Sequence, residues 1–178
     1  DGEAGKSLAK IVHQAQSEMQ IPLTFPPKGG LHSSLYHCPD CQRKLKPVLD
    51  GSRQLKHHRC GKCDTQWKGY PYDDVHYTAV HFKNFKRGLL AAKAFILTDE
   101  DEYAVFVRDL LVGYSDRYQG YKRTKGILSR GRYGHICSTD HEAGSLMMQY
   151  LGPMYDMAGH HPAFSAEDHR HIQDDMIK

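Results

Sequence analysis

Four cysteines in two closely spaced pairs constrain the fold of this chain more than any other feature. Cys38 and Cys41 form one C-x2-C pair, and Cys60 and Cys63 form a second after eighteen intervening residues. Two intervening residues let a tight turn direct both sulfurs at one ion, and two such pairs supply four ligands for zinc. Main-chain amides of each turn can donate to the sulfurs. The spacing therefore predicts a structural Zn²⁺ site, with two disulfides as the alternative if the protein is exported.

The residues between the cysteine pairs predict a small β-hairpin. Two short β-prone runs flank Asp50-Gly51, and an Asp-Gly pair is a strong signal for a two-residue turn. A tight turn that holds one C-x2-C pair is called a knuckle, and two knuckles with a hairpin between them form the layout of a zinc ribbon. A module of about forty residues cannot build a sufficient core alone, so bound metal would supply much of its folding energy. Trp67 is expected to seat this module on the following helices, or alternatively to stack on sugars or bases.

Positive charge is concentrated in the same segment. Residues 32–70 hold eight Lys or Arg and three acids, whereas the formal net charge of the whole chain is only +3. A local basic patch suits an anionic polymer, either nucleic acid or an acidic polysaccharide. The alternative is a solvated face that offsets the negative thiolates. No apolar run approaches the roughly 20 residues of a membrane span, so we expect none.

The chain divides into three parts. Residues 1–31 hold a short helix, predicted over 7–20, and a Pro- and Gly-rich linker. Residues 32–70 form the zinc-ribbon-like module, and residues 71–178 follow a helical period without strands. The predicted fold class is therefore mainly α, with antiparallel helical hairpins that form part of an incomplete (α/α) toroid and a small four-Cys β insert.

Two long helices are predicted at the start of the third part. Apolar residues spaced by three or four from Val75 to Ile96 predict the first, with Asp73 or Asp74 as its N-cap. Thr98 is the predicted N-cap of the second, because four acidic residues follow it where the helix dipole favours anions. Since one or two residues would join them, the two helices should form an antiparallel hairpin.

Two further helices are predicted after a long loop. Residues 119–137 are rich in Gly, Lys and Arg, and loops of this length are often functional. A third helix is predicted over 139–158, and Gly152-Pro153 must kink or break it. The last helix is predicted to begin after Ser165 as its N-cap.

Three stretches carry a resemblance to one enzyme family. The first is Tyr36-His-Cys-Pro-Asp-Cys41, followed by the second cysteine pair and Gly69-Tyr-Pro-Tyr-Asp73. The second and most specific runs from His81 through Tyr118, where a first helix ends in residues 97–104 and the next ends in residues 110–118, with Tyr-Ser-Asp-Arg-Tyr at its close. The third and looser one consists of Gly131-Arg132, Glu142-Ala143, Tyr155-Asp156 and residues 165–169. Together they resemble the N-terminal helical region of the heparinase II/III-like polysaccharide lyases, including the alginate-lyase-like branch.

The resemblance implies the function and the surroundings of the chain. Such lyases cleave uronate-containing polymers, such as alginate or a glycosaminoglycan, by β-elimination, and Arg132 and Glu142 would contact the sugar. In the family, the Asn-His pair that neutralises the carboxylate and the catalytic Tyr lie beyond the matched stretch, and the only Asn here, Asn84, precedes Phe85. The resemblance thus implies no catalytic residue here, a larger enzyme chain as partner, and a periplasmic or extracellular location.

A non-enzymatic function is the competing hypothesis. In it, the ribbon is a binding module for nucleic acid or another anionic polymer, and the helices are its scaffold. The ribbon shows no alternation of basic and aromatic residues beyond Trp67 and Tyr70, which makes nucleic acid the less favoured partner. Salt-sensitive binding to DNA or RNA, without binding to uronate polymers, would favour this hypothesis.

Overall fold

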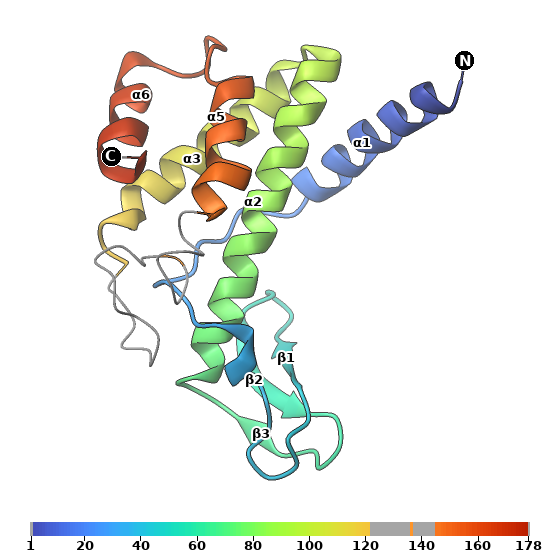
Figure 1. Cartoon of the computed structure of the whole chain (residues 1–178), viewed down its shortest axis with the longest axis vertical. Helices are drawn as coiled ribbons and strands as arrows, with labels where there is room; N and C mark the ends of the chain where they lie inside the picture. Colours follow the sequence, from blue (N-terminus) through green and yellow to red (C-terminus); the bar gives the residue numbers. More distant parts are fainter. Residues whose placement is uncertain (1, 122–135, 137–144, 178) are drawn as a thin grey trace.

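A single long helix organises the molecule. The computed structural model describes residues 2–121, 136 and 145–177. Helix α2 (Tyr72–Thr98) runs along most of the length of the molecule, with a small β-sheet near its first turns and the other helices toward its far end (Figure 1). Helix α1 (Glu3–Met19) begins four residues earlier than predicted and projects to one side. Among the described helices, none has the length and apolar character that a bilayer crossing requires.

The cysteine-rich segment folds as a three-stranded antiparallel sheet. Strands β1 (Leu45–Leu49), β2 (Leu55–Cys60) and β3 (Gln66–Trp67) are neighbours in that order. The predicted hairpin is therefore present, but its two-residue Asp-Gly turn is wrong. Five residues join β1 to β2, and the left-handed residue is Arg53, with a φ of 63°, not Gly51. The Asp50 carboxylate accepts the N–H groups of Ser52 and Gln54, both at 2.9 Å, and this side-chain turn opens the loop.

The predicted N-cap of α2 has another role. The helix begins directly after Pro71, so Asp73 already lies in its first turn. The Asp73 carboxylate accepts the Gly69 N–H at 3.0 Å and lies 2.8 Å from His58 Nε2. Asp73 therefore links the ribbon to the helix rather than capping it.

The predicted hairpin of two long helices is present, although the assignment of Thr98 is wrong. Thr98 is the last residue of α2, and its hydroxyl donates to Ala94 O at 3.0 Å. Asp99 adopts a left-handed conformation with a φ of 58°, and its N–H bonds to Phe95 O, which ends the helix. Glu100 then precedes α3 (Asp101–Tyr118), which packs on α2.

The buried face of α2 differs from its predicted apolar stripe. Ile96 is 57% exposed and Ala79 is exposed, whereas His81, Asn84 and Arg87 are buried. On α3 the apolar stripe is confirmed, because its members are fully buried except for half-buried Phe106 (Tyr103, Val107, Leu110, Leu111, Tyr114). The difference arises because polar residues of α2 are covered by a segment far away in the sequence.

Two shorter helices complete the main core. A π-helical turn, η2 (Met147–Leu151), leads into α5 (Gly152–Ala158), so Pro153 lies in the first turn, where its missing N–H is tolerated. Helix α6 (Ala166–Ile172) has the predicted N-cap, since Ser165 and Asp168 form a reciprocal capping box. A second π-helical turn, η3 (Gln173–Ile177), follows it. The mainly α fold with helical hairpins is confirmed, and closure into a toroid stays a prediction.

The apolar interior has two separate parts. The larger core lies among α2, α3, α5 and α6, where a Cβ on Gly88 would approach Met154 Sδ to 2.2 Å. The smaller core lies around the cysteines and contains Leu31, Tyr36 and Leu45 packed against the first turn of α2. The two cores thus share helix α2 but no buried residue.

Candidate metal centre

The four cysteine sulfurs lie close enough together to hold one ion. All four Sγ atoms lie within 4.8 Å of one another, with Cys41 to Cys60 at 3.3 Å and Cys38 to Cys63 at 3.6 Å. A tetrahedral ion with bonds of about 2.3 Å places its sulfurs about 3.8 Å apart. A disulfide needs about 2.05 Å, and these four cysteines are free thiols. The predicted four-cysteine cluster is therefore confirmed as a site that could hold a metal ion.

The two knuckles have the same backbone geometry. In each, the N–H of the first cysteine bonds to the carbonyl five residues later, and its own carbonyl accepts the N–H four residues later. These distances are 2.8 and 2.8 Å in the first knuckle (Cys38, Gln42, Arg43) and 3.0 and 3.1 Å in the second (Cys60, Asp64, Thr65). The residue after the second cysteine is left-handed in both, with a φ of 57° at Gln42 and 62° at Asp64. Both turns thus point their sulfurs at one place.

Hydrogen bonds in the second knuckle favour thiolates, which are the ligand form of cysteine. The backbone amides of Cys63 and Lys62 lower the pKa of Cys60, and Lys62 N lies 3.5 Å from its sulfur. Hydrogen bonds from the side chain and the backbone of Thr65 lower the pKa of Cys63 to about 6. The predicted role of main-chain amides is therefore present at Cys60.

A buried hydrogen-bond chain fixes the cluster to the helices. Tyr36 OH lies 2.6 Å from His58 Nδ1, and His58 Nε2 lies 2.8 Å from the Asp73 carboxylate. Because the carboxylate only accepts, Nε2 is the donor in the contact with Asp73. The Trp67 ring also lies 5.7 Å from that of Tyr72 in α2, as expected for a residue that seats the ribbon. Residues next to both knuckles thus hold the cluster against one helix end.

A row of polar side chains on α2, which sequence reasoning missed, binds the linker between α1 and the ribbon. The pairs of side chain and backbone carbonyl are Thr78 with Leu31, His81 with Lys28, Asn84 with Thr24, and Arg87 with Ile21. The linker runs antiparallel to the helix, because the carbonyls fall in number as the donors rise. These four polar residues recur at every third position from Thr78 to Arg87. A search for apolar periodicity does not detect this polar pattern, although it is visible in the sequence.

Three buried residues have the side-chain types that β-elimination uses, but no substrate can reach them. Tyr114 OH lies 3.0 Å from His81 Nδ1 and 3.2 Å from Asn84 Nδ2. Burial lowers the pKa of His81 to about 4, so its ring is neutral near pH 7. None of the three is more than 1% exposed, and linker carbonyls occupy both His81 and Asn84. The cluster therefore positions the linker.

The remaining predicted site residues are not placed. Arg132 and Glu142, predicted to contact sugar, lie outside the described residues, as does most of the predicted loop over 119–137. The four cysteines are thus the predicted site that the structure brings together, and four protein ligands leave no open position on a metal. Comparison with protein-family models, curated proteins and solved structures finds no significant match to this chain.

Proposed function

We propose that this chain is the N-terminal helical portion of a polysaccharide lyase that cleaves uronate-containing polymers. The observation that supports it is the arrangement of the segments that carry the resemblance. The ribbon, which contains both C-x2-C pairs, lies on the first turn of α2, and α2 and α3 pack as one hairpin. The most specific stretch, residues 81–118, covers most of α2, the junction of that hairpin and the whole of α3. The family assignment also favours a periplasmic or extracellular location.

The ion in the ribbon is proposed to be Zn²⁺ with a structural role. Four thiolates are soft ligands, and their tetrahedral spacing suits zinc. With all four positions occupied by protein, the ion has no place for water or substrate. Its role is to fold the ribbon and hold it against α2, where Tyr36, His58 and Asp73 complete the contact.

The catalytic step is assigned to the larger enzyme chain of which this portion forms the start. In β-elimination a base removes the proton at C5 of the uronate, the C4–O bond breaks, and a C4–C5 double bond forms. An acid protonates the departing glycosidic oxygen, and a neutralising group must face the carboxylate. Among the described residues, the Asn84, His81 and Tyr114 cluster is sealed by the linker. Residues 1–178 alone are therefore expected to be inactive.

The test compares this chain with the longest natural polypeptide that contains it. Both are loaded with zinc and incubated with alginate, heparan sulfate and chondroitin sulfate, and the double bond formed is followed by its ultraviolet absorbance. We expect the longer polypeptide to cleave at least one polymer and residues 1–178 to cleave none. Turnover by residues 1–178, or none by the folded longer polypeptide, would overturn the proposal.

A binding module for nucleic acid is the second candidate, because most of the excess positive charge lies in residues 32–70. It is tested by titrating the chain with single-stranded and double-stranded DNA and RNA at several salt concentrations. Submicromolar binding that weakens steeply with salt, together with no affinity for uronate oligomers, would favour it over the lyase.

A further inference from the structure

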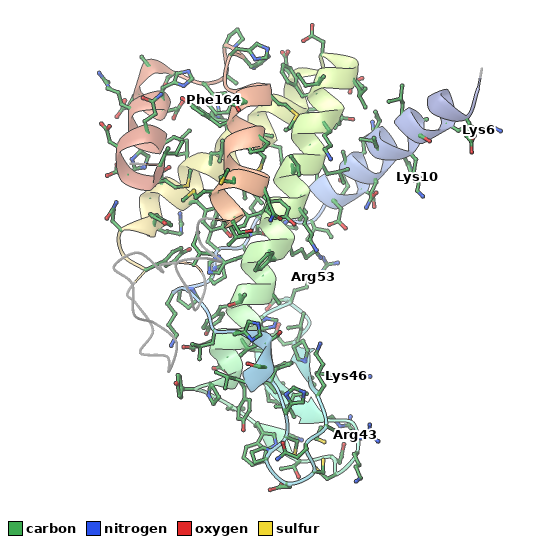
Figure 2. All side chains as sticks on the ribbon, in the orientation of Figure 1. Lys6, Lys10, Arg43, Lys46, Arg53 and Phe164 are labelled. Carbon is green, nitrogen blue, oxygen red and sulfur yellow. The ribbon has the colours of Figure 1, made fainter. Side chains whose placement is uncertain are left out.

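A groove of about 720 Å³ lies between α1, the ribbon and α2. Helix α1 and strand β1 lie on the same side of α2, and residues of α2 form the floor between them (Figure 1). Figure 2 shows labelled basic side chains along this side of the molecule, on α1 at Lys10 and on the ribbon at Lys46 and Arg53. The volume is in the range of sites that bind small molecules and short oligomers, roughly 300–1,000 Å³.

Three lysines give the groove a positive charge. Lys44 comes from the start of the ribbon, and Lys83 and Lys86 lie one turn apart on α2; all three are exposed. Within the part of the chain that the structure describes, none of them is in an ion pair. Glu18, the acid among the described lining residues, already lies 3.8 Å from the buried Arg87 Nε. An anionic ligand would therefore meet cations that no described acid pairs with.

The rest of the lining suits a sugar more than a nucleobase. The floor includes apolar side chains such as Phe82 and Leu90, which can pack on the C–H faces of a sugar ring. Gln14, Ser33 and His76 add hydrogen-bonding groups, and burial lowers the pKa of His76, so its neutral ring both donates and accepts near pH 7. A single strand of nucleic acid usually needs an aromatic platform for successive bases. Among the described lining residues, Phe82 is the one aromatic residue of the Phe, Tyr and Trp types that is not buried.

We infer that this groove is a binding site for a short segment of a polyuronate, with Lys44, Lys83 and Lys86 paired to its carboxylates. The choice of a uronate polymer over other acidic glycans rests on the proposed function. The groove would hold one stretch of the polymer between α1, the ribbon and α2.

The experiment is a calorimetric titration of the zinc-loaded chain with a short oligomannuronate of defined length. A neutral mannose oligomer of the same length is the matched ligand. The test variant is Lys83→Gln with Lys86→Gln, and the control is Lys93→Gln, an exposed lysine of the same helix outside the groove. Zinc content and circular dichroism confirm that each variant is folded.

We expect the wild-type chain to bind the uronate oligomer and to bind the neutral one at least about 10-fold more weakly. Because an exposed ion pair contributes about 0.5–1 kcal/mol, or roughly 2- to 5-fold in Kd, the double variant should weaken binding about 10-fold. The Lys93→Gln control should change Kd less than about 2-fold. Lys44→Gln removes one groove lysine and should weaken binding roughly 2- to 5-fold. Lys62→Gln, on the ribbon outside the groove, should leave Kd unchanged.

Three results would overturn the inference. They are equal affinity for the neutral oligomer, equal weakening by the groove and control variants, and tighter lysine-dependent binding of single-stranded DNA or RNA. The inference and the proposed function fail separately. If the chain binds uronate through these lysines but the longer polypeptide does not cleave it, only the lyase proposal is contradicted. If the longer polypeptide cleaves the polymer but the groove does not bind it, only the proposed binding site is contradicted.

Discussion

Acidification should destabilise this protein through His81, which is buried as a neutral ring between two hydrogen-bond partners. Nε2 donates to the Lys28 carbonyl at 3.0 Å, because a carbonyl only accepts. Nδ1 must then accept from Tyr114 OH, which lies 3.0 Å away. A second proton on the ring would oppose the Tyr114 hydroxyl proton and place a charge in the buried interior. Burial lowers the pKa of His81 from 6.5 to about 4 for this reason.

The size of the effect follows from the two pKa values. They differ by about 2.5 pH units, and each unit corresponds to about 1.4 kcal/mol, which gives about 3.5 kcal/mol in total. Because the unfolded chain binds the proton more readily, this stability is fully present above pH 6.5 and is lost as the pH falls from 6.5 towards 4. About 2 kcal/mol should be lost between pH 7 and pH 5. That is a large share of a typical unfolding free energy of about 5–15 kcal/mol.

The assay is urea unfolding of the wild-type chain and of the His81→Gln variant at several pH values. Glutamine can donate to the Lys28 carbonyl and accept from Tyr114, but it does not titrate. We expect the difference in unfolding free energy between the two proteins to shrink by about 2 kcal/mol from pH 7 to pH 5. Loss of metal in acid affects both proteins and cancels in the difference. Parallel curves for the two proteins would refute the assignment of His81 as a buried neutral ring.

The remaining predictions concern the metal, the packing of α2 and a second histidine. Removal of the metal by a chelator should increase amide hydrogen exchange in residues 36–67 and leave most helical circular dichroism, because the two apolar cores are separate; collapse of both together would contradict this. Gly88→Ala should destabilise the fold by about 1–3 kcal/mol in urea unfolding, since its Cβ would lie 2.2 Å from Met154 Sδ. Gly51→Ala, with open space around its Cβ, is the matched control and should change stability little. The His171 ring nitrogens lie 2.8 Å from the Asp116 carboxylate and 2.6 Å from that of Asp175, and both contacts raise the pKa of His171. Its contribution to folding stability is therefore present below pH 6.5 and disappears as the pH rises through that raised pKa. In urea unfolding, the His171→Gln variant should not show this loss of unfolding free energy above pH 6.5. If the variant and the wild-type chain have the same pH profile of unfolding free energy, the ion pairs are excluded.

Local features of this protein could be predicted from the sequence. Within each C-x2-C pair the covalent chain limits both sulfurs to one tight turn, and the Ser165 cap follows from contacts within four residues. The apolar stripe of α3 was equally predictable, since an amphipathic helix buries its apolar face. Each of these depends on residues that are neighbours in the chain.

The tertiary structure alone decided which face of α2 is buried and where its ends lie. His81, Asn84 and Arg87 look like solvent-exposed polar residues in the sequence, yet they are buried against the linker. The ends of α2 depend on the ribbon, which engages Asp73, and on the left-handed turn at Asp99. The physical reason is that buried backbone carbonyls need donors, and the donors come from whatever segment packs on them. That pairing spans 47 to 66 residues, from Thr78 with Leu31 to Arg87 with Ile21, beyond the reach of local periodicity.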